Sequence, residues 1–193
     1  RPTDDAVLAG RVIDRSIRHQ FPKSYKHYVQ VIITVLSVDG VNDPDVLALV
    51  ATSAAISISS IPWAGPVSAV RMGYVHGAEG DKGALIVNPT ITEQEMSDFD
   101  FIVSSSKDKV LMLEGGFCET SDEVTYEAVL KAKEANVKII KLIDDLVKEV
   151  GKPKAAVPET TQTDELKAKI VKDYKKEMEL AFAKKLKKNL AGR

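Results

Sequence analysis

A run of apolar and β-branched residues over 29–38 constrains the fold of this chain more than any other feature. It reads Val-Gln-Val-Ile-Ile-Thr-Val-Leu-Ser-Val and is almost uninterrupted by polar side chains. Such a run fits a central β-strand that is buried on both faces. The segment 45–59, rich in Ala, Ile and Ser, fits a helix that can lie close against a sheet. Together they predict a mixed α and β fold.

Helices and further strands surround this run. Apolar spacing, capping residues and Gly or Pro breaks predict helices over 3–21, 45–59, 92–97, 121–150 and 163–190, with Thr3, Ser121 and Thr163 as N-caps. Strands are expected over 67–75, 84–87, 99–104 and 109–114, with a hairpin turn over 77–83. The order of these elements predicts an α+β core.

The chain is long enough for one globular core and an appendage, at 193 residues. We expect the core to span 1–151 and a linker with prolines and small residues to span 152–162. Residues 163–193 then begin a separate all-α segment. The apolar stripe of its helix has little to pack on within this sequence.

Composition narrows the classes of function. The formal net charge of −1 gives no global basic field, so a contact with RNA or phosphate has to come from a local cluster. The single cysteine, Cys118, excludes an internal disulfide and favours a reducing, cytoplasmic compartment. The three histidines are scattered, which argues against a structural zinc site. No apolar run is long enough for a membrane span, and the start at Arg1-Pro2 suggests a piece of a longer protein.

One local cluster of cations stands out. Arg11, Arg15 and Arg18 are spaced i, i+4, i+7 and share one face of the first expected helix, beside apolar residues. Guanidinium groups suit phosphate oxygens, so this face is a candidate anion site. The alternative is a solvated face on which Asp14 and Asp4 act as ion partners. Spacing alone leaves both open.

Several segments, taken in order, resemble the polynucleotide phosphorylase family. Residues 11–22, RVIDRSIRHQFP, resemble the family signature RLIDRPIRPLFP, and 61–67, IPWAGPV, resemble IPFNGPI. Further matches lie at 29–38, 41–45, 53–55, 73–74, 87–90, 110–114 and 147–153. The chain departs from the family at His19, at Trp63-Ala64 and at Lys131-Ala132-Lys133, where the family often has Phe-Gly-His. The resemblance covers essentially the whole chain.

The resemblance implies an RNase PH-like core of the ribosomal protein S5 domain 2-like type, without its first strands, followed by the start of an all-α RNA-binding domain. Members of the family carry two such cores and assemble as a homotrimeric ring that threads single-stranded RNA. Phosphate attacks the 3′-terminal phosphodiester and releases nucleoside diphosphates, with Mg²⁺ or Mn²⁺ in the active core. Partners in an RNA-degradation complex and a cytoplasmic location are further expectations.

Residues 94–102 indicate which core this is. In the active core the matching segment reads roughly Asp-His-Leu-Gly-Asp-Met-Asp-Phe-Lys, and its aspartates and lysine serve the metal and the transition state. Here Gln94 replaces the first aspartate and Ile102 the lysine, although Asp98 and Asp100 remain. The resemblance therefore implies the non-catalytic first core, with no catalytic or metal-binding residue in this chain.

The same resemblance gives the arginines a role. Arg11 and Arg15 match arginines of the first core that point toward the active centre of the second core, and Arg18 matches too, although it could pair with carboxylates. The expected RNA- or phosphate-binding residues are Arg11, Arg15 and Arg18. An alternative is a non-catalytic RNA-binding or assembly subunit of an exosome-like ring. A stand-alone RNase PH is disfavoured by the helical extension after Pro153.

Overall fold

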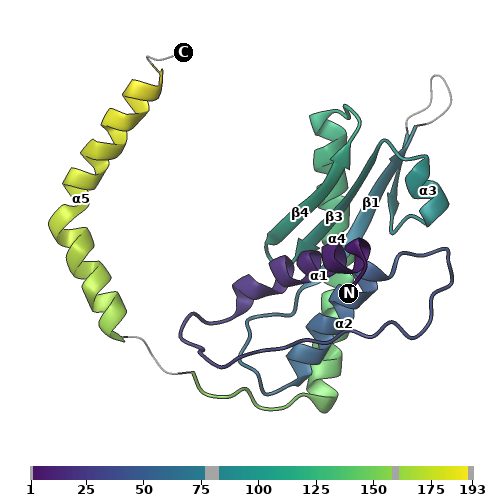
Figure 1. Ribbon diagram of the computed structural model, residues 1–193, viewed down its shortest axis with the longest axis horizontal. Helices are drawn as coiled ribbons and strands as arrows, with labels where there is room; N and C mark the ends of the chain where they lie inside the picture. The colour runs from purple at the N-terminus through teal and green to yellow at the C-terminus, as the bar shows by residue number, and fades with distance from the viewer. Residues whose placement is uncertain (1, 77–82, 158–160, 191–193) are drawn as a thin grey trace. The chain divides into compact units, whose positions relative to one another are not determined.

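The computed structural model describes residues 2–76, 83–157 and 161–190 of the chain, without the side chains of 161–163 and 184–190. It divides into two compact units, Arg1–Ala156 and Val157–Arg193. Figure 1 shows the course of the chain. The first unit is an α+β core, as the sequence predicts, and the second consists of one helix.

The helices of the first unit begin at residues whose side chains cap them. They are α1 (Asp4–Ile17), continued by the 3-10 turn η1 (Arg18–Gln20), α2 (Pro44–Ile58), α3 (Ile91–Glu95) and α4 (Asp122–Val150). Thr3 and Ser121 accept hydrogen bonds from Ala6 N and Val124 N, as expected of N-caps. A capping box between Thr90 and Glu93 starts α3 at Ile91, one residue earlier than predicted.

Four strands form one antiparallel sheet in the order β2-β1-β3-β4. Their bounds are β1 (Ser68–Val75), β2 (Ala84–Val87), β3 (Phe99–Ser105) and β4 (Val110–Phe117). The predicted pairing of 67–75 with 84–87 is confirmed by the register Met72↔Val87 to Val75↔Ala84. Most of the expected turn, 77–82, lies outside the described residues. Strand β4 pairs with β3 on one side and forms an edge of the sheet.

The sheet separates two apolar layers, and side chains of β1 and β3 alternate between them. One layer joins α1 and α2 to the sheet through Val12, Ile13, Ile17, Leu49, Ile56, Val67, Ala69, Ile102 and Met112. The other joins α4 to the sheet through Val70, Met72, Phe99, Phe101, Val103, Ala128 and Ala132. In Figure 1, α1 lies in front of the strands and α4 behind them. The layers hold α1 firmly against the sheet.

The prediction of a buried central strand over 29–38 is wrong. The segment forms no strand and pairs with no strand of the described chain, and Ile32 and Leu36 are 78% and 93% exposed. The composition was right for a strand, but a strand also needs a neighbour that takes its backbone N–H and C=O groups. No described element supplies one, so the apolar side chains remain exposed.

The second unit contains α5 (Thr161–Leu190). The predicted start at Thr163, with Thr163 as its N-cap, is wrong because the helix begins at Thr161. Apolar side chains such as Ile170, Tyr174 and Phe182 are about half exposed or more. Among the described residues, no helix combines the length and the apolar character that crossing a membrane requires.

Candidate nucleic-acid interface

The cation face of α1 follows from how the helix packs. Val12, Ile13, Ser16 and Ile17 are buried against the sheet and α2, so the arginines between them are turned toward solvent. Arg11, Arg15 and Arg18 are all exposed. The shared face predicted from their spacing is present, but the three guanidinium groups have different surroundings.

Two of the three arginines have carboxylate partners. Arg15 Nη1 donates to Glu114 Oε2 of β4 at 2.8 Å. Arg18 forms a two-pronged pair with Asp14, one turn earlier on the same helix, in which Nε donates to Oδ1 at 3.0 Å. Asp14 therefore acts as an ion partner, as the solvated-face interpretation expected. Asp4 makes no ion pair within the described residues.

Arg11 makes no side-chain hydrogen bond or ion pair within the described part of the chain. Its guanidinium and the unused N–H groups of Arg15 lie one turn apart along the helix. Guanidinium N–H groups that have no protein acceptor can bind phosphate oxygens, with shorter and stronger hydrogen bonds than neutral donors form. Arg11 and Arg15 together form the cation pair of α1.

The polar groups of the segment 94–102 face other parts of the core, although Asp98 Oδ2 and Asp100 Oδ1 are buried and accept no hydrogen bond within the described residues. Gln94 Nε2 donates to Pro89 O at 3.0 Å. Asp98 Oδ2 lies 2.9 Å from His76 Nε2, and Asp100 Oδ2 accepts from Arg71 Nη1 at 2.6 Å. Ile102 is buried in the apolar layer beneath α1 and α2.

These contacts do not fit a divalent metal. The two carboxylates that match metal-binding positions face an arginine and a histidine, and the positions of the first aspartate and the lysine carry Gln94 and Ile102. Among the described residues, no group of three or more His, Cys, Asp or Glu side chains is arranged to hold a metal ion. No reaction step is therefore assigned to a metal bound by this chain.

A cluster around Arg71 was not foreseen from the sequence. Its Nη2 lies 2.6 Å from Asp45 Oδ2 and 3.0 Å from Asp43 Oδ2, while Nη1 binds Asp100. Asn88 Oδ1 accepts from the backbone N of Arg71 at 3.0 Å. The signal in the sequence was Asp43-Pro44-Asp45, which indicated only a loop and a helix start. The contact with Arg71 depends on a strand that lies far along the chain.

Burial and charge act against each other in this cluster. Burial raises the pKa of Asp45, although Arg71 opposes the shift. For Arg71, burial works to lower the pKa, but the carboxylates of Asp45, Asp100 and Asp43 outweigh it and raise the pKa. The cluster is therefore a structural ion network that ties the start of α2 to β1 and β3.

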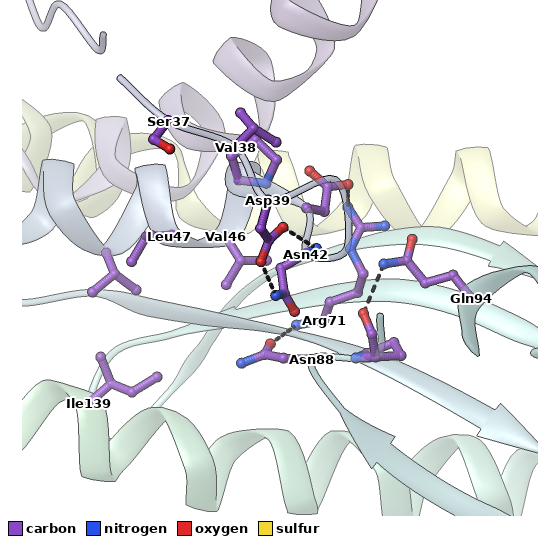
Figure 2. A pocket seen from close by; sticks show the side chains of 14 residues that line it. Ser37, Val38, Asp39, Asn42, Val46, Leu47, Arg71, Asn88, Gln94 and Ile139 are labelled. Carbon is purple, nitrogen blue, oxygen red and sulfur yellow. Dashed lines mark hydrogen bonds and ion pairs between the residues drawn. The ribbon is translucent and has the colours of Figure 1, made fainter. Parts of the chain in front are cut away.

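A cavity of about 550 Å³ opens beside this cluster (Figure 2). Its apolar side includes Val46, Leu47 and Ile139, and its polar side includes Asp39, Asn42 and Gln94. Hydrogen bonds from Val41 N, Asn42 N and the Asn42 side chain lower the pKa of Asp39 to about 2. The carboxylates of Asp39 and Asp43 disfavour an RNA phosphate here. The exposed face of α1 remains the better candidate for that contact.

Two family models match the chain in succession. The 3′ exoribonuclease family, domain 1, matches residues 1–62, and domain 2 of the same family matches residues 65–135. Together they cover α1 to the first half of α4, including the cation pair and the acidic segment.

Named relatives agree with these matches. A polyribonucleotide nucleotidyltransferase of Caldicellulosiruptor saccharolyticus is 45% identical over 88% of this chain and 23% of its own length. Those of Alkaliphilus metalliredigens and Thermus thermophilus are 43% and 40% identical over 89% and 87% of this chain. The chain spans about a quarter of the length of these relatives. From its two family matches and from these relatives, the chain belongs to the 3′ exoribonuclease family, among the polyribonucleotide nucleotidyltransferases.

Proposed function

We propose that this chain is the non-catalytic first core of a phosphate-dependent 3′-to-5′ exoribonuclease. In the full-length polypeptide, inorganic phosphate attacks the phosphorus of the 3′-terminal phosphodiester. The 3′ oxygen of the preceding nucleotide leaves, and a nucleoside diphosphate is released. The reaction is reversible, so the same centre can extend RNA from nucleoside diphosphates. The family match and the names of the relatives support this proposal.

One observation carries the assignment to a non-catalytic core: Gln94 and Ile102 stand where the active core has its first metal-binding aspartate and its lysine, and Ile102 is buried in the apolar layer beneath α1 and α2. A neutral amide and an aliphatic side chain cannot supply the carboxylate oxygen that Mg²⁺ prefers or the positive charge of the lysine. We infer that the second core binds the Mg²⁺ or Mn²⁺ and supplies the catalytic residues.

The contribution of this chain to the active centre is the cation pair. Arg11 and Arg15 lie on a helix that the apolar layer holds in place, and both present guanidinium N–H groups to solvent. Positive charge that is fixed near a transferring phosphoryl group stabilises the charge of the transition state. We propose that both arginines contact RNA phosphates or the incoming phosphate. Arg18 has a weaker claim because Asp14 already binds it on two sides.

The wider setting belongs to the same proposal. Single-stranded RNA is the substrate, the full-length enzyme is a homotrimeric ring in the cytoplasm, and this chain helps to build the ring and its RNA channel. Other proteins of an RNA-degradation complex are further possible partners. Residues 163–193, which include most of α5, begin an all-α RNA-binding domain in this proposal.

Release of ADP from poly(A), with phosphate and Mg²⁺ present, tests the proposal. The full-length polypeptide should release ADP, and the isolated 193-residue chain should not. Arg11→Ala and Arg15→Ala in the full-length polypeptide should each slow the release of ADP. Lys141→Ala, which removes an exposed cation on α4, should not slow it. ADP release by the isolated chain at the full-length rate would refute the assignment to a non-catalytic core.

The same assay separates the alternative. A non-catalytic RNA-binding or assembly subunit of an exosome-like ring would bind poly(A) but release no ADP even as the full-length polypeptide. Normal activity of both arginine variants would return Arg11 and Arg15 to the solvated-face interpretation.

A further inference from the structure

Arg15 differs from the other arginines of α1 in being held by a residue from a distant part of the chain. Its acceptor, Glu114, lies 99 positions later, on β4. Arg18, at the start of the turn η1 that continues α1, pairs with Asp14 only four residues earlier, and Arg11 makes no contact of this kind among the described residues. The position of the Arg15 guanidinium therefore depends on how α1 packs against the sheet.

The backbone of Glu114 is held firmly. It pairs with Ile102 in the register between β3 and β4. The next residue, Gly115, packs so closely on β3 that an added Cβ would come within 2.2 Å of Asp100 O. Beside it, Ser16 Oγ of α1 lies 3.8 Å from Sδ of the buried Met112. The packing of α1 against β4 is therefore close at the point where Arg15 contacts Glu114.

The pair with Glu114 uses only one of the guanidinium nitrogens of Arg15. Glu114 Oε2 accepts from Nη1 at 2.8 Å, and neither Nε nor Nη2 of Arg15 has an acceptor within the described residues. A guanidinium is planar and presents its N–H groups as a fixed fork. Holding the fork through Nη1 restricts where the guanidinium can lie and leaves N–H groups free for the oxygens of a phosphate.

The pair is poorly suited to stabilising the fold. The side chains of Arg15 and Glu114 are 52% and 37% exposed. Ion pairs of this exposure contribute little to stability because water and salt screen them. We expect the Arg15–Glu114 pair instead to reduce the rotamer freedom of Arg15. An arginine without such a partner loses that freedom only when it binds a ligand.

We propose that Glu114 is a positioning residue that orients Arg15 toward a phosphate of the RNA or toward the incoming phosphate. This inference rests on the proposed function and adds to it a residue that acts only through Arg15. Without Glu114 the same guanidinium is present but samples many rotamers, so binding becomes weaker. Arg11, which has no such partner in the described chain, should contribute less to binding than Arg15.

Steady-state phosphorolysis of poly(A) by the full-length polypeptide tests this proposal. Glu114→Ala should raise the KM for poly(A) or for phosphate about two- to fivefold, because an exposed ion pair can restrict the rotamers of Arg15 only by the small free energy that the pair contributes. Glu114→Gln should retain most of the wild-type KM, because its amide oxygen can accept the same bond from Nη1. Asp145→Ala, which breaks the exposed pair with Lys148 on α4, serves as the matched control and should change neither constant.

A double-mutant comparison shows whether Glu114 acts through Arg15. In an Arg15→Ala background, Glu114→Ala should cause no further change in KM. An equal loss in both backgrounds would mean a structural effect and would overturn the proposal, as would tighter binding by Glu114→Ala, since Glu114 would then compete with phosphate. Thermal unfolding of each variant identifies any general loss of fold.

The test also separates this inference from the proposed function. If Arg15→Ala lowers activity and Glu114→Ala does not, the inference about Glu114 fails and the arginine role stands. If Arg15→Ala has no effect, the arginine role itself fails.

Discussion

Arg71 of β1 and Asp45 in the first turn of α2 form an ion pair in which Nη2 and Oδ2 lie 2.6 Å apart, and each side chain is only 12% exposed. Asp43 and Asp100 complete the set of carboxylates around the same guanidinium. These contacts fix the start of α2 to the sheet, and Arg71 and Asp43 also line the cavity in Figure 2.

Arg71→Met should destabilise the protein by about 3 kcal/mol, because removing one partner of a buried ion pair leaves an uncompensated charge. Urea unfolding at pH 7 measures the loss. Arg71→Lys should cost less, because it keeps the charge but loses the fork that reaches several carboxylates. An equal loss for both variants would show that the geometry of the fork, and not its charge, stabilises this contact.

The cost of Arg71→Met should also depend on pH. A carboxyl group whose pKa is raised in the folded state disfavours folding above that pKa, and the penalty disappears as the pH falls through it. Burial already raises the pKa of Asp45, and loss of Arg71 should raise it further. The difference in unfolding free energy between wild type and Arg71→Met should therefore shrink between neutral and acidic pH. A constant difference would show that Asp45 does not carry the effect.

Asp39→Asn should lower stability at neutral pH through a carboxyl group whose pKa is shifted in the other direction. Hydrogen bonds from the 41–42 segment lower the pKa of Asp39 from 3.8 to about 2, so the ionised form stabilises the fold. This contribution is complete above the unfolded pKa and is lost as the pH falls through the folded value. Asp39→Asn should be less stable than wild type at neutral pH, and the gap should close between about pH 4 and pH 2. NMR titration of the Asp39 carboxyl group checks the pKa directly.

Lys154→Met should loosen the segment that follows α4. Lys154 Nζ donates to the carbonyl oxygens of Ile56, Ser57 and Ser59 at 2.8–2.9 Å, at the end of α2. A cation at a helix C-terminus satisfies free carbonyl groups and interacts well with the helix dipole. The expected loss is about 1 kcal/mol, a low value for a charged donor because water screens this exposed site.

Hydrogen exchange provides the local measurement for Lys154. The amides of Lys152 and Ala155, which donate to Ile58 O and Ser60 O, should exchange faster in the variant. Lys152→Met is the matched control, since the Lys152 side chain makes no hydrogen bond among the described residues. Unchanged protection of both amides in Lys154→Met would rule out the anchoring role.

Gly65→Ala should destabilise the first unit by about 1–3 kcal/mol through overpacking. A Cβ at Gly65 would come within 2.2 Å of Cζ3 of Trp63. The ring has little room to move, because its Nε1 donates to Ile17 O at 3.1 Å and it packs beside Phe21. Thermal unfolding measures the cost. In a Trp63→Leu variant, Gly65→Ala should destabilise the protein much less. An equal loss of stability in the wild-type and Trp63→Leu backgrounds would show that the clash does not involve the Trp63 ring.

Much of the fold could be read from the sequence, because its signals act over short distances. Thr3 and Ser121 cap the helices they precede. Apolar spacing predicts that α4 is a helix, but only part of its apolar stripe is buried: Ala128 is covered, whereas Leu142 is exposed. The strands of the sheet were found within a few residues of their bounds. Composition alone mispredicts the 29–38 segment, because a strand also depends on a neighbouring strand that composition cannot supply.

The candidate site divides in the same way. The sequence by itself determined that Arg11, Arg15 and Arg18 share one face, since a helix brings every third and fourth residue together. Tertiary structure alone decided that Arg15 meets Glu114 and that Asp100 meets Arg71. Those partners lie on strands far along the chain, and their contacts exist only once the sheet has assembled and the helices have packed onto it. Helical period is a local property of the backbone, whereas the partner of a charge is set by the whole fold.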